Sequence, residues 1–77
     1  RIADVNGNIV DGEAILRDTR DSIVINEGGE KMAVGVVGME NVVVVVSEDA
    51  VLVIPKDQAQ RVKEVVKELK ERGGAQV

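Results

Sequence analysis

The chain has 77 residues, with 14 acidic and 10 basic side chains and a formal net charge of −4. Because a nucleic-acid-binding domain presents a basic face, this balance argues against nucleic acid as a partner. Cysteine and histidine are both absent, which excludes disulfides, thiolate or histidine zinc sites, and Ser–His–Asp or Cys–His catalysis within these residues.

Apolar residues make up 44% of the chain, with no aromatic residue, 17 valines and 6 isoleucines. Side chains branched at Cβ suit extended backbone and pack well on a pleated surface. Small branched side chains also fit a narrow interior, such as a thin sheet stack or a coiled β-solenoid. A domain of this length buries only about 60% of its unfolded surface, so we expect support from self-association or from a neighbouring domain.

Turn residues divide the first 55 residues into short apolar stretches. Asn6-Gly7 and Asp11-Gly12 are strong turn pairs, because both residue types tolerate positive φ. The predicted strands are residues 9–10, 14–16, 23–25, 32–37, 42–46 and 50–54. Gly35 is expected to interrupt the fourth strand, and Pro55 to end the last. Val42–Val46 lacks alternation, which predicts a strand buried on both faces.

Residues 57–72 change to a helical period. The apolar residues of this segment fall at the spacing of one helical face: Ala59, Val62, Val65, Val66 and Leu69. Asp57 is the predicted N-cap, and Gly73-Gly74 is the predicted stop. We expect the apolar face to pack on the β part of the same domain, because amphipathic helices usually bury their apolar face against their own domain.

No stretch of the chain predicts a membrane segment. Runs such as Val42–Val46 are far shorter than the ~20 residues that span a bilayer. The charged side of the 57–72 helix balances its basic residues with glutamates, and the helix lacks Trp and Phe, which argues against a membrane-surface role. No charged-then-apolar leader opens the chain, so we expect a cytoplasmic location.

The carboxylates and glycines show no arrangement typical of a catalytic or phosphate-binding site. The carboxylates Glu48, Asp49, Asp18, Asp21 and Asp57 all lie in predicted turns or on solvated surfaces. Turn formation and solubility explain them better than acid–base work or Mg²⁺ binding. Gly28-Gly29 and the Gly35/Gly38 pair open no helix and precede no Lys-Ser/Thr pair. We therefore predict no catalytic, cofactor-binding or metal-binding residue.

Three stretches together resemble the C-terminal region of mannose-1-phosphate guanylyltransferases. Residues 4–13 follow the family pattern D-x-x-G-N-x-x-x-G-[DE], and residues 38–44 follow G-[VM]-[ED]-[ND]-[LV]-[VI]-V. Residues 49–63 follow D-A-[LV]-L-V-x-x-[KR]-[DS] and then A-Q-x-V-K, at a junction from strand to helix. One departure stands out: the family usually has Asp-Thr where this chain has Val46-Ser47.

The resemblance implies a mainly β domain with one C-terminal α-helix, namely a short left-handed β-helix closed by the amphipathic helix. It also implies a place after a nucleotide-binding catalytic domain that joins a guanosine nucleotide to mannose-1-phosphate. The glycine-rich catalytic loop of that domain has no counterpart here, nor has the histidine metal site of the isomerase domain in bifunctional members.

We therefore expect a single domain over residues 1–77, with a β part at 1–55 and a helix at 57–72, as a fragment of a larger nucleotidyltransferase. Its expected role is non-catalytic scaffolding and oligomerisation, without activity on its own. The expected partners are a second copy, with a dimer favoured, and the missing N-terminal catalytic domain. The alternatives are an effector- or sugar-nucleotide-binding module, and an engineered self-assembling β fragment with no ligand.

Overall fold

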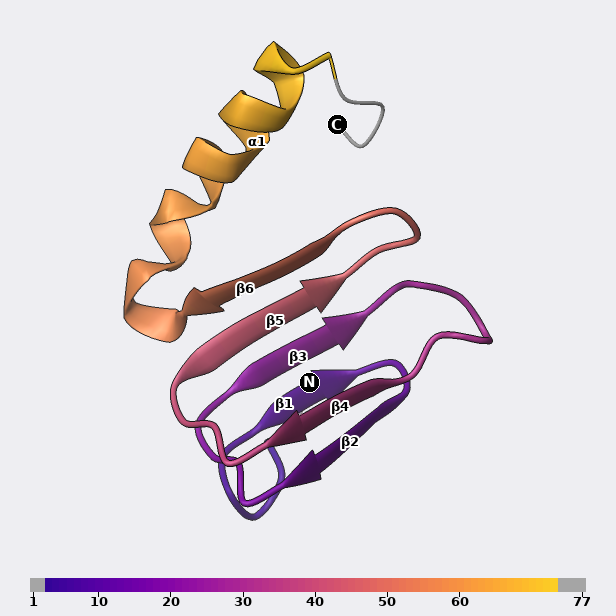
Figure 1. Cartoon of the computed structure of the whole chain (residues 1–77). Helices are drawn as coiled ribbons and strands as arrows, with labels where there is room; N and C mark the ends of the chain where they lie inside the picture. The colour runs from indigo at the N-terminus through magenta and orange to yellow at the C-terminus, as the bar shows by residue number, and fades with distance from the viewer. Residues whose placement is uncertain (1–2, 74–77) are drawn as a thin grey trace.

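The computed structural model of the protein describes residues 3–73 (Figure 1). Strands come first and two helical segments last. In chain order the elements are β1 Ile9–Asp11, β2 Ala14–Arg17, β3 Ile23–Asn26, β4 Val34–Val37, β5 Val42–Val46, β6 Val51–Pro55, the 3-10 helix η1 Lys56–Arg61, and α1 Val62–Glu71. Each predicted strand is confirmed to within two residues at either end, although Gly35 lies inside β4 and does not interrupt it. The chain is mainly β with a C-terminal helix, as expected.

Successive strands alternate between two facing sheets. One sheet has the order β1-β3-β5-β6, in which the first three strands are parallel and β6 runs antiparallel to β5. The other sheet consists of β2 and β4, also parallel. Because β1 to β5 enter the two sheets in turn, the backbone coils as a short β-helix. The hairpin to β6 then ends the coil.

The corners of the coil repeat one backbone conformation. Gly7, Asp21 and Asn41 each lie two residues before paired positions of β1, β3 and β5, and their φ values are 81°, 53° and 56°. A left-handed conformation is costly for most residues and least so for Gly, Asn and Asp. Asn6-Gly7 is a turn as predicted, but the equivalent corner positions of Asp21 and Asn41 were not predicted.

The core lies between the two sheets and consists almost entirely of valine. Its buried members are Val24, Val36, Val42, Val44 and Val46, with Ala14, Leu16 and Val34 packed against them. Along β5 burial alternates, because Val43 and Val45 on the other face of the sheet are only half-buried. The prediction that this strand is buried on both faces was therefore only half right.

Three polar side chains are buried at the corners of the coil and hold its turns together. Asn8 Nδ2 donates to the Thr19 carbonyl at 2.8 Å, and Asn8 Oδ1 accepts from the Ser22 amide at 3.0 Å. Ser22 Oγ in turn accepts from the Val42 amide at 3.1 Å. These bonds link three successive coils through side chains that are at most 3% exposed. No buried side-chain nitrogen or oxygen among residues 3–73 lacks a partner.

The start of the helical region differs from the prediction. Lys56–Arg61 forms the 3-10 helix η1, which is interrupted by a non-helical residue at Gln58 (φ −122°, ψ 19°), and α1 begins only at Val62. Neither segment has a side-chain hydrogen bond at its N-cap, so the assignment of Asp57 as a cap is wrong. Instead, Arg61 bridges to Glu64 at 2.8 Å across the first turn of α1. Gly73 has φ 68° just beyond α1, whereas Gly74 lies outside the described residues.

The helix does not cover the β part. No residue of α1 is buried, and its main contacts are with η1. Figure 1 shows α1 extending past the edge strand β6 and away from both sheets. The expectation that its apolar face packs on the strands of its own chain, closing the β-helix, is therefore wrong. Neither α1 nor any other helix within residues 3–73 is long and apolar enough to cross a membrane.

Candidate functional site

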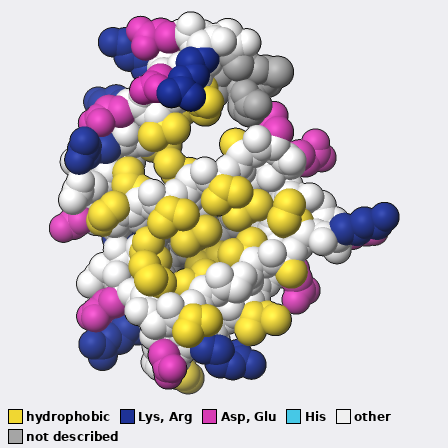
Figure 2. Space-filling model, viewed as in Figure 1, with side chains coloured by type: hydrophobic (Ala, Val, Ile, Leu, Met, Phe, Trp, Pro, Cys, Tyr) yellow, Lys and Arg dark blue, Asp and Glu magenta, His cyan; other side chains and the backbone are white. Residues whose placement is uncertain are grey.

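An open apolar groove lies on the inner side of the four-stranded sheet. It arises because that sheet has four strands while the facing sheet has only two, so the last strand, β6, extends beyond the facing sheet and leaves Val51 and Val53 exposed. The groove has a volume of about 540 Å³ and is lined by Met32, Ala33, Val34, Gly35, Val36, Val37, Met39, Val42, Val44, Val46, Val51 and Val53. Figure 2 shows these apolar side chains gathered at the centre of one face, with charged side chains around the periphery.

The groove exposes side chains that a finished core would bury. Val51 and Val53 of β6 pair with Val46 and Val44, yet they are 67% and 60% exposed. Val46, at the position where the guanylyltransferase pattern has Asp, is 3% exposed and belongs to the core. The substituted valine therefore extends the apolar surface from the core into the groove. A contiguous patch of this kind commonly marks an interaction site.

A second apolar surface lies along α1. Val62 and Val65 are 36% and 47% exposed, and Val66 and Leu69 are half-buried. These four residues, which we call the α1 stripe, are spaced at the 3, 4 and 7 positions of one helical face. The sequence predicted the stripe correctly but not its packing, because no residue of α1 is buried against the described β part.

The outward face of the four-stranded sheet is also apolar. Ile23, Ile25, Val43 and Val45 alternate with the core residues and are half-buried. On the edge strand β6, Leu52 continues this face, while Ile54 is buried where η1 meets the sheet. A fully solvated outer face would ordinarily be polar.

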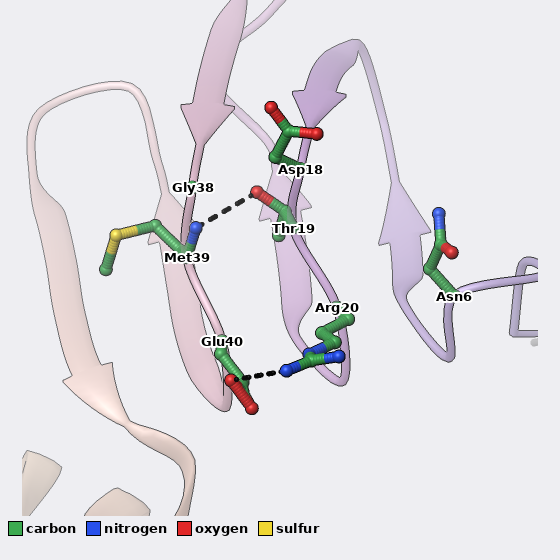
Figure 3. A pocket seen from close by; sticks show the side chains of 7 residues that line it. All are labelled: Asn6, Asp18, Thr19, Arg20, Gly38, Met39 and Glu40. Atoms are coloured by element: carbon green, nitrogen blue, oxygen red, sulfur yellow. Dashed lines mark hydrogen bonds and ion pairs between the residues drawn. The ribbon is translucent and has the colours of Figure 1, made fainter.

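A polar pocket lies at one corner of the coil. It has a volume of about 360 Å³ and is lined by Asn6, Asp18, Thr19, Arg20, Gly38, Met39 and Glu40. Figure 3 shows Arg20 reaching the Glu40 carboxylate, at 3.2 Å, and Thr19 Oγ1 accepting from the Met39 amide, at 3.3 Å. Since its arginine is already paired with a carboxylate, the pocket offers little positive charge to a phosphate group. Its interactions brace two successive coils.

The acidic residues considered from the sequence are dispersed through the structure. Asp18 and Asp21 occupy left-handed corner positions, and Asp57 lies in η1. Glu48 and Asp49 form the β5–β6 turn, where Ser47 Oγ donates to Asp49 Oδ1 at 3.3 Å. Among residues 3–73, no three His, Cys, Asp or Glu side chains lie close enough together to hold a metal ion.

Asp4 is the acidic side chain with the clearest electrostatic perturbation. The hydrogen bond from the Asn8 amide to its carboxylate lowers the pKa of Asp4, and the Asn6 amide adds to the effect. The cause is local turn geometry, since Asp4 is exposed. The Arg61–Glu64 hydrogen bond likewise lowers the pKa of Glu64 at the surface of α1. These shifts therefore reflect local turn and helix structure.

The glycines have structural rather than phosphate-binding roles. A Cβ added at Gly12 would lie 2.2 Å from the Asn26 carbonyl oxygen, so only glycine fits beside that strand. Asn26 also organises the β3–β4 loop, since its side-chain amide donates to the carbonyls of Glu13 and Met32, and its Oδ1 accepts from Gly28.

Known proteins resemble this chain over most of its length. The family model of the MannoseP isomerase/GMP-like beta-helix domain matches residues 12–69. Alginate biosynthesis protein AlgA from Pseudomonas putida is 40% identical over 70 residues, covering 91% of this chain but 14% of AlgA. A putative mannose-1-phosphate guanylyltransferase from Vibrio cholerae is 38% identical over 73 residues, covering 95% of this chain and 15% of that protein.

A solved structure has the same fold. The crystal structure described as mannose-1-phosphate geranyltransferase from Thermus thermophilus superposes with a TM-score of 0.73 and 36% identity. The match covers 87% of this chain and 20% of that one. The chain thus spans about one seventh of the length of the curated relatives that it matches. The resemblance to mannose-1-phosphate guanylyltransferases is confirmed.

Proposed function

Since this chain belongs to the family of MannoseP isomerase/GMP-like β-helix domains, we propose that it is the non-catalytic scaffolding and self-association domain of a cytoplasmic mannose-1-phosphate guanylyltransferase. The observation that carries the proposal is the open valine groove on the inner face of β5 and β6. A surface that continues the core of a small domain into solvent is stabilised by contact with another chain.

The catalytic work then belongs to another part of the longer protein. Relatives named as mannose-1-phosphate guanylyltransferase or alginate biosynthesis protein are about seven times the length of the matched segment. The outward apolar face of the four-stranded sheet, with Ile23, Ile25, Val43 and Val45, suits contact with such a domain. The polar corner pocket contributes no unpaired arginine that would favour a nucleotide phosphate.

Two measurements test the proposal. Sedimentation equilibrium of the isolated chain, read by interference because aromatic residues are absent, should show a dimer at micromolar concentration. A monomer across a hundredfold dilution range would refute self-association. Incubation with GTP and mannose-1-phosphate should release no pyrophosphate above a no-protein blank.

The alternative, a sugar-nucleotide- or effector-binding module, depends on the polar corner pocket. Calorimetric titration with GDP-mannose and with GTP separates the two functions, because only a binding module gives saturable heat. Arg20→Ala should abolish such heat if the corner pocket holds the ligand, since Arg20 is the cation that lines it.

A further inference from the structure

We infer that α1 of a second copy of this chain fills the apolar groove, so that the dimer forms by a reciprocal exchange of helices. The inference rests on the proposed self-association and names the two surfaces that carry it. Each copy would insert its α1 stripe into the groove of the other, which gives a two-fold symmetric pair in which the same contact occurs twice.

The dimensions of the two surfaces match. The groove runs along β5, whose five residues span about 17 Å, and α1 has ten residues with a length of about 15 Å. A third strand facing β5 would lie in a layer about 10 Å from the sheet. A helix with its side chains is about 10–12 Å across, so it fits the layer that the missing strand leaves open.

The chemistry of the two surfaces also matches. The α1 stripe consists of three valines and a leucine, and the floor of the groove consists of the valines of β5 and β6. Met32 and Met39 also line the groove and are 37% and 41% exposed. Methionine side chains are flexible and adapt to irregular apolar partners, so they can close around an inserted helix.

Charge favours contact between a helix and a β part. Residues 56–73 carry six basic and four acidic side chains, a net charge of +2, whereas residues 1–55 carry four basic and ten acidic side chains, a net charge of −6. Docking the helix of one copy on the β part of another brings opposite charges together. Pairing two β parts directly would bring like charges together.

The anchoring of η1 directs α1 to another copy. The Lys56 amide donates to the Asn41 carbonyl at 2.7 Å, and Lys56 Nζ donates to the Asp21 carbonyl at 3.2 Å. Ile54, just before η1, is buried. These contacts fix the start of the helical region at the edge of the sheet, and α1 extends past β6 (Figure 1).

Three single substitutions at exposed positions test the exchange with little risk to folding. Val65→Lys alters the α1 stripe, Val53→Lys alters the groove, and Ile15→Lys alters an exposed apolar residue of β2 that does not line the groove. We expect the first two to weaken the homodimer at least tenfold in Kd, and the control to change it less than twofold. Circular dichroism and thermal melting confirm that each variant is folded.

Mixing the two weakened variants gives the decisive result. A Val65→Lys chain keeps an intact groove, and a Val53→Lys chain keeps an intact helix, so their heterodimer retains one undamaged contact of the two. Native mass spectrometry with one chain isotopically labelled should therefore show more heterodimer than either homodimer.

The alternative occupants give different results. A Val65→Lys chain that dimerises like the parent overturns the helix exchange but leaves the self-association proposal standing. If the unmodified chain is monomeric and Val65→Lys lowers its melting temperature, α1 covers the groove of its own chain. That result overturns both the helix exchange and the proposed self-association. A monomeric unmodified chain whose melting temperature does not change on Val65→Lys also overturns both proposals.

Discussion

The buried asparagine at the first corner of the coil should be among the most sensitive positions in the chain. Asn8 is 2% exposed, and its side chain is bonded to the Thr19 carbonyl and to the Ser22 amide. Asn8→Ala removes both bonds, together with the one that Asn8 Nδ2 donates to Asp4 Oδ2 at 3.2 Å, and leaves a buried donor and a buried acceptor without partners. Each such group costs about 1–3 kcal/mol, so we expect a loss of about 3 kcal/mol.

That loss is a large share of the stability of the fold. A chain of this size has a free energy of unfolding of about 4–12 kcal/mol. In urea, with an m-value of about 1 kcal/mol per molar for a small domain, the midpoint should fall by about 3 M. Far-ultraviolet circular dichroism follows the transition. All variants are compared at one protein concentration, because self-association itself adds stability.

Asn6→Ala provides the matched control. Asn6 has the same side chain and lies two residues away, but it is exposed, and only its backbone groups make the bonds found at this turn. Its replacement should change stability by less than about 0.5 kcal/mol. If the two alanine variants unfold at the same urea concentration, the buried asparagine does not hold the coils together.

Three further predictions follow from local geometry. Gly12→Ala should lower the free energy of unfolding by at least about 2 kcal/mol, because the residue has φ 91° and the new Cβ would lie 2.2 Å from a backbone oxygen. Gly38 has φ 69° and open space around it, so Gly38→Ala should lower it by only about 1 kcal/mol in the same denaturation assay. Asp57→Ala should leave the melting temperature within about 2 °C, since no cap bond is lost, and a larger fall would restore the capping role. The lowered pKa of Asp4 stabilises the fold above the ordinary pKa of about 3.9, and this contribution disappears as pH falls through the lower folded value. Asp4→Asn should therefore flatten the acid side of the stability–pH curve, and an unchanged acid limb would contradict the assignment.

The sequence predicted the strands because two independent local signals coincide. Valine and isoleucine favour extended backbone, and Gly, Asn and Asp supply the left-handed corners between the strands. The equivalence of Asp21 and Asn41 to Gly7 was missed because neither position has a glycine. The available signal was an Asp or Asn, Asp21 or Asn41, at the position that corresponds to Gly7, two residues before the paired positions Ile23 and Val43.

The helix was predicted in composition but not in its contacts. Spacing alone identifies Val62, Val65, Val66 and Leu69 as one face, yet it gives no information about which surface that face meets. The start of the helix was misplaced because Asp57 follows Pro55 and Lys56 in a 3-10 turn, and a break at Gln58 separates that turn from α1. A cap residue is recognised from sequence only where the helix that follows is continuous.

The open groove is a property of topology, which no local pattern in the sequence encodes. Had the chain continued coiling after β5, the next strand would have joined the sheet of β2 and β4 and extended the cover over the core. Instead the Ser47–Ala50 turn reverses the chain, and β6 adds Val51 and Val53 to the uncovered face. The same reversal sends α1 past the edge of the sheet. One turn thus creates both an apolar surface that lacks a cover and an apolar helix that lacks a partner, which is why an exchange between two copies satisfies both at once.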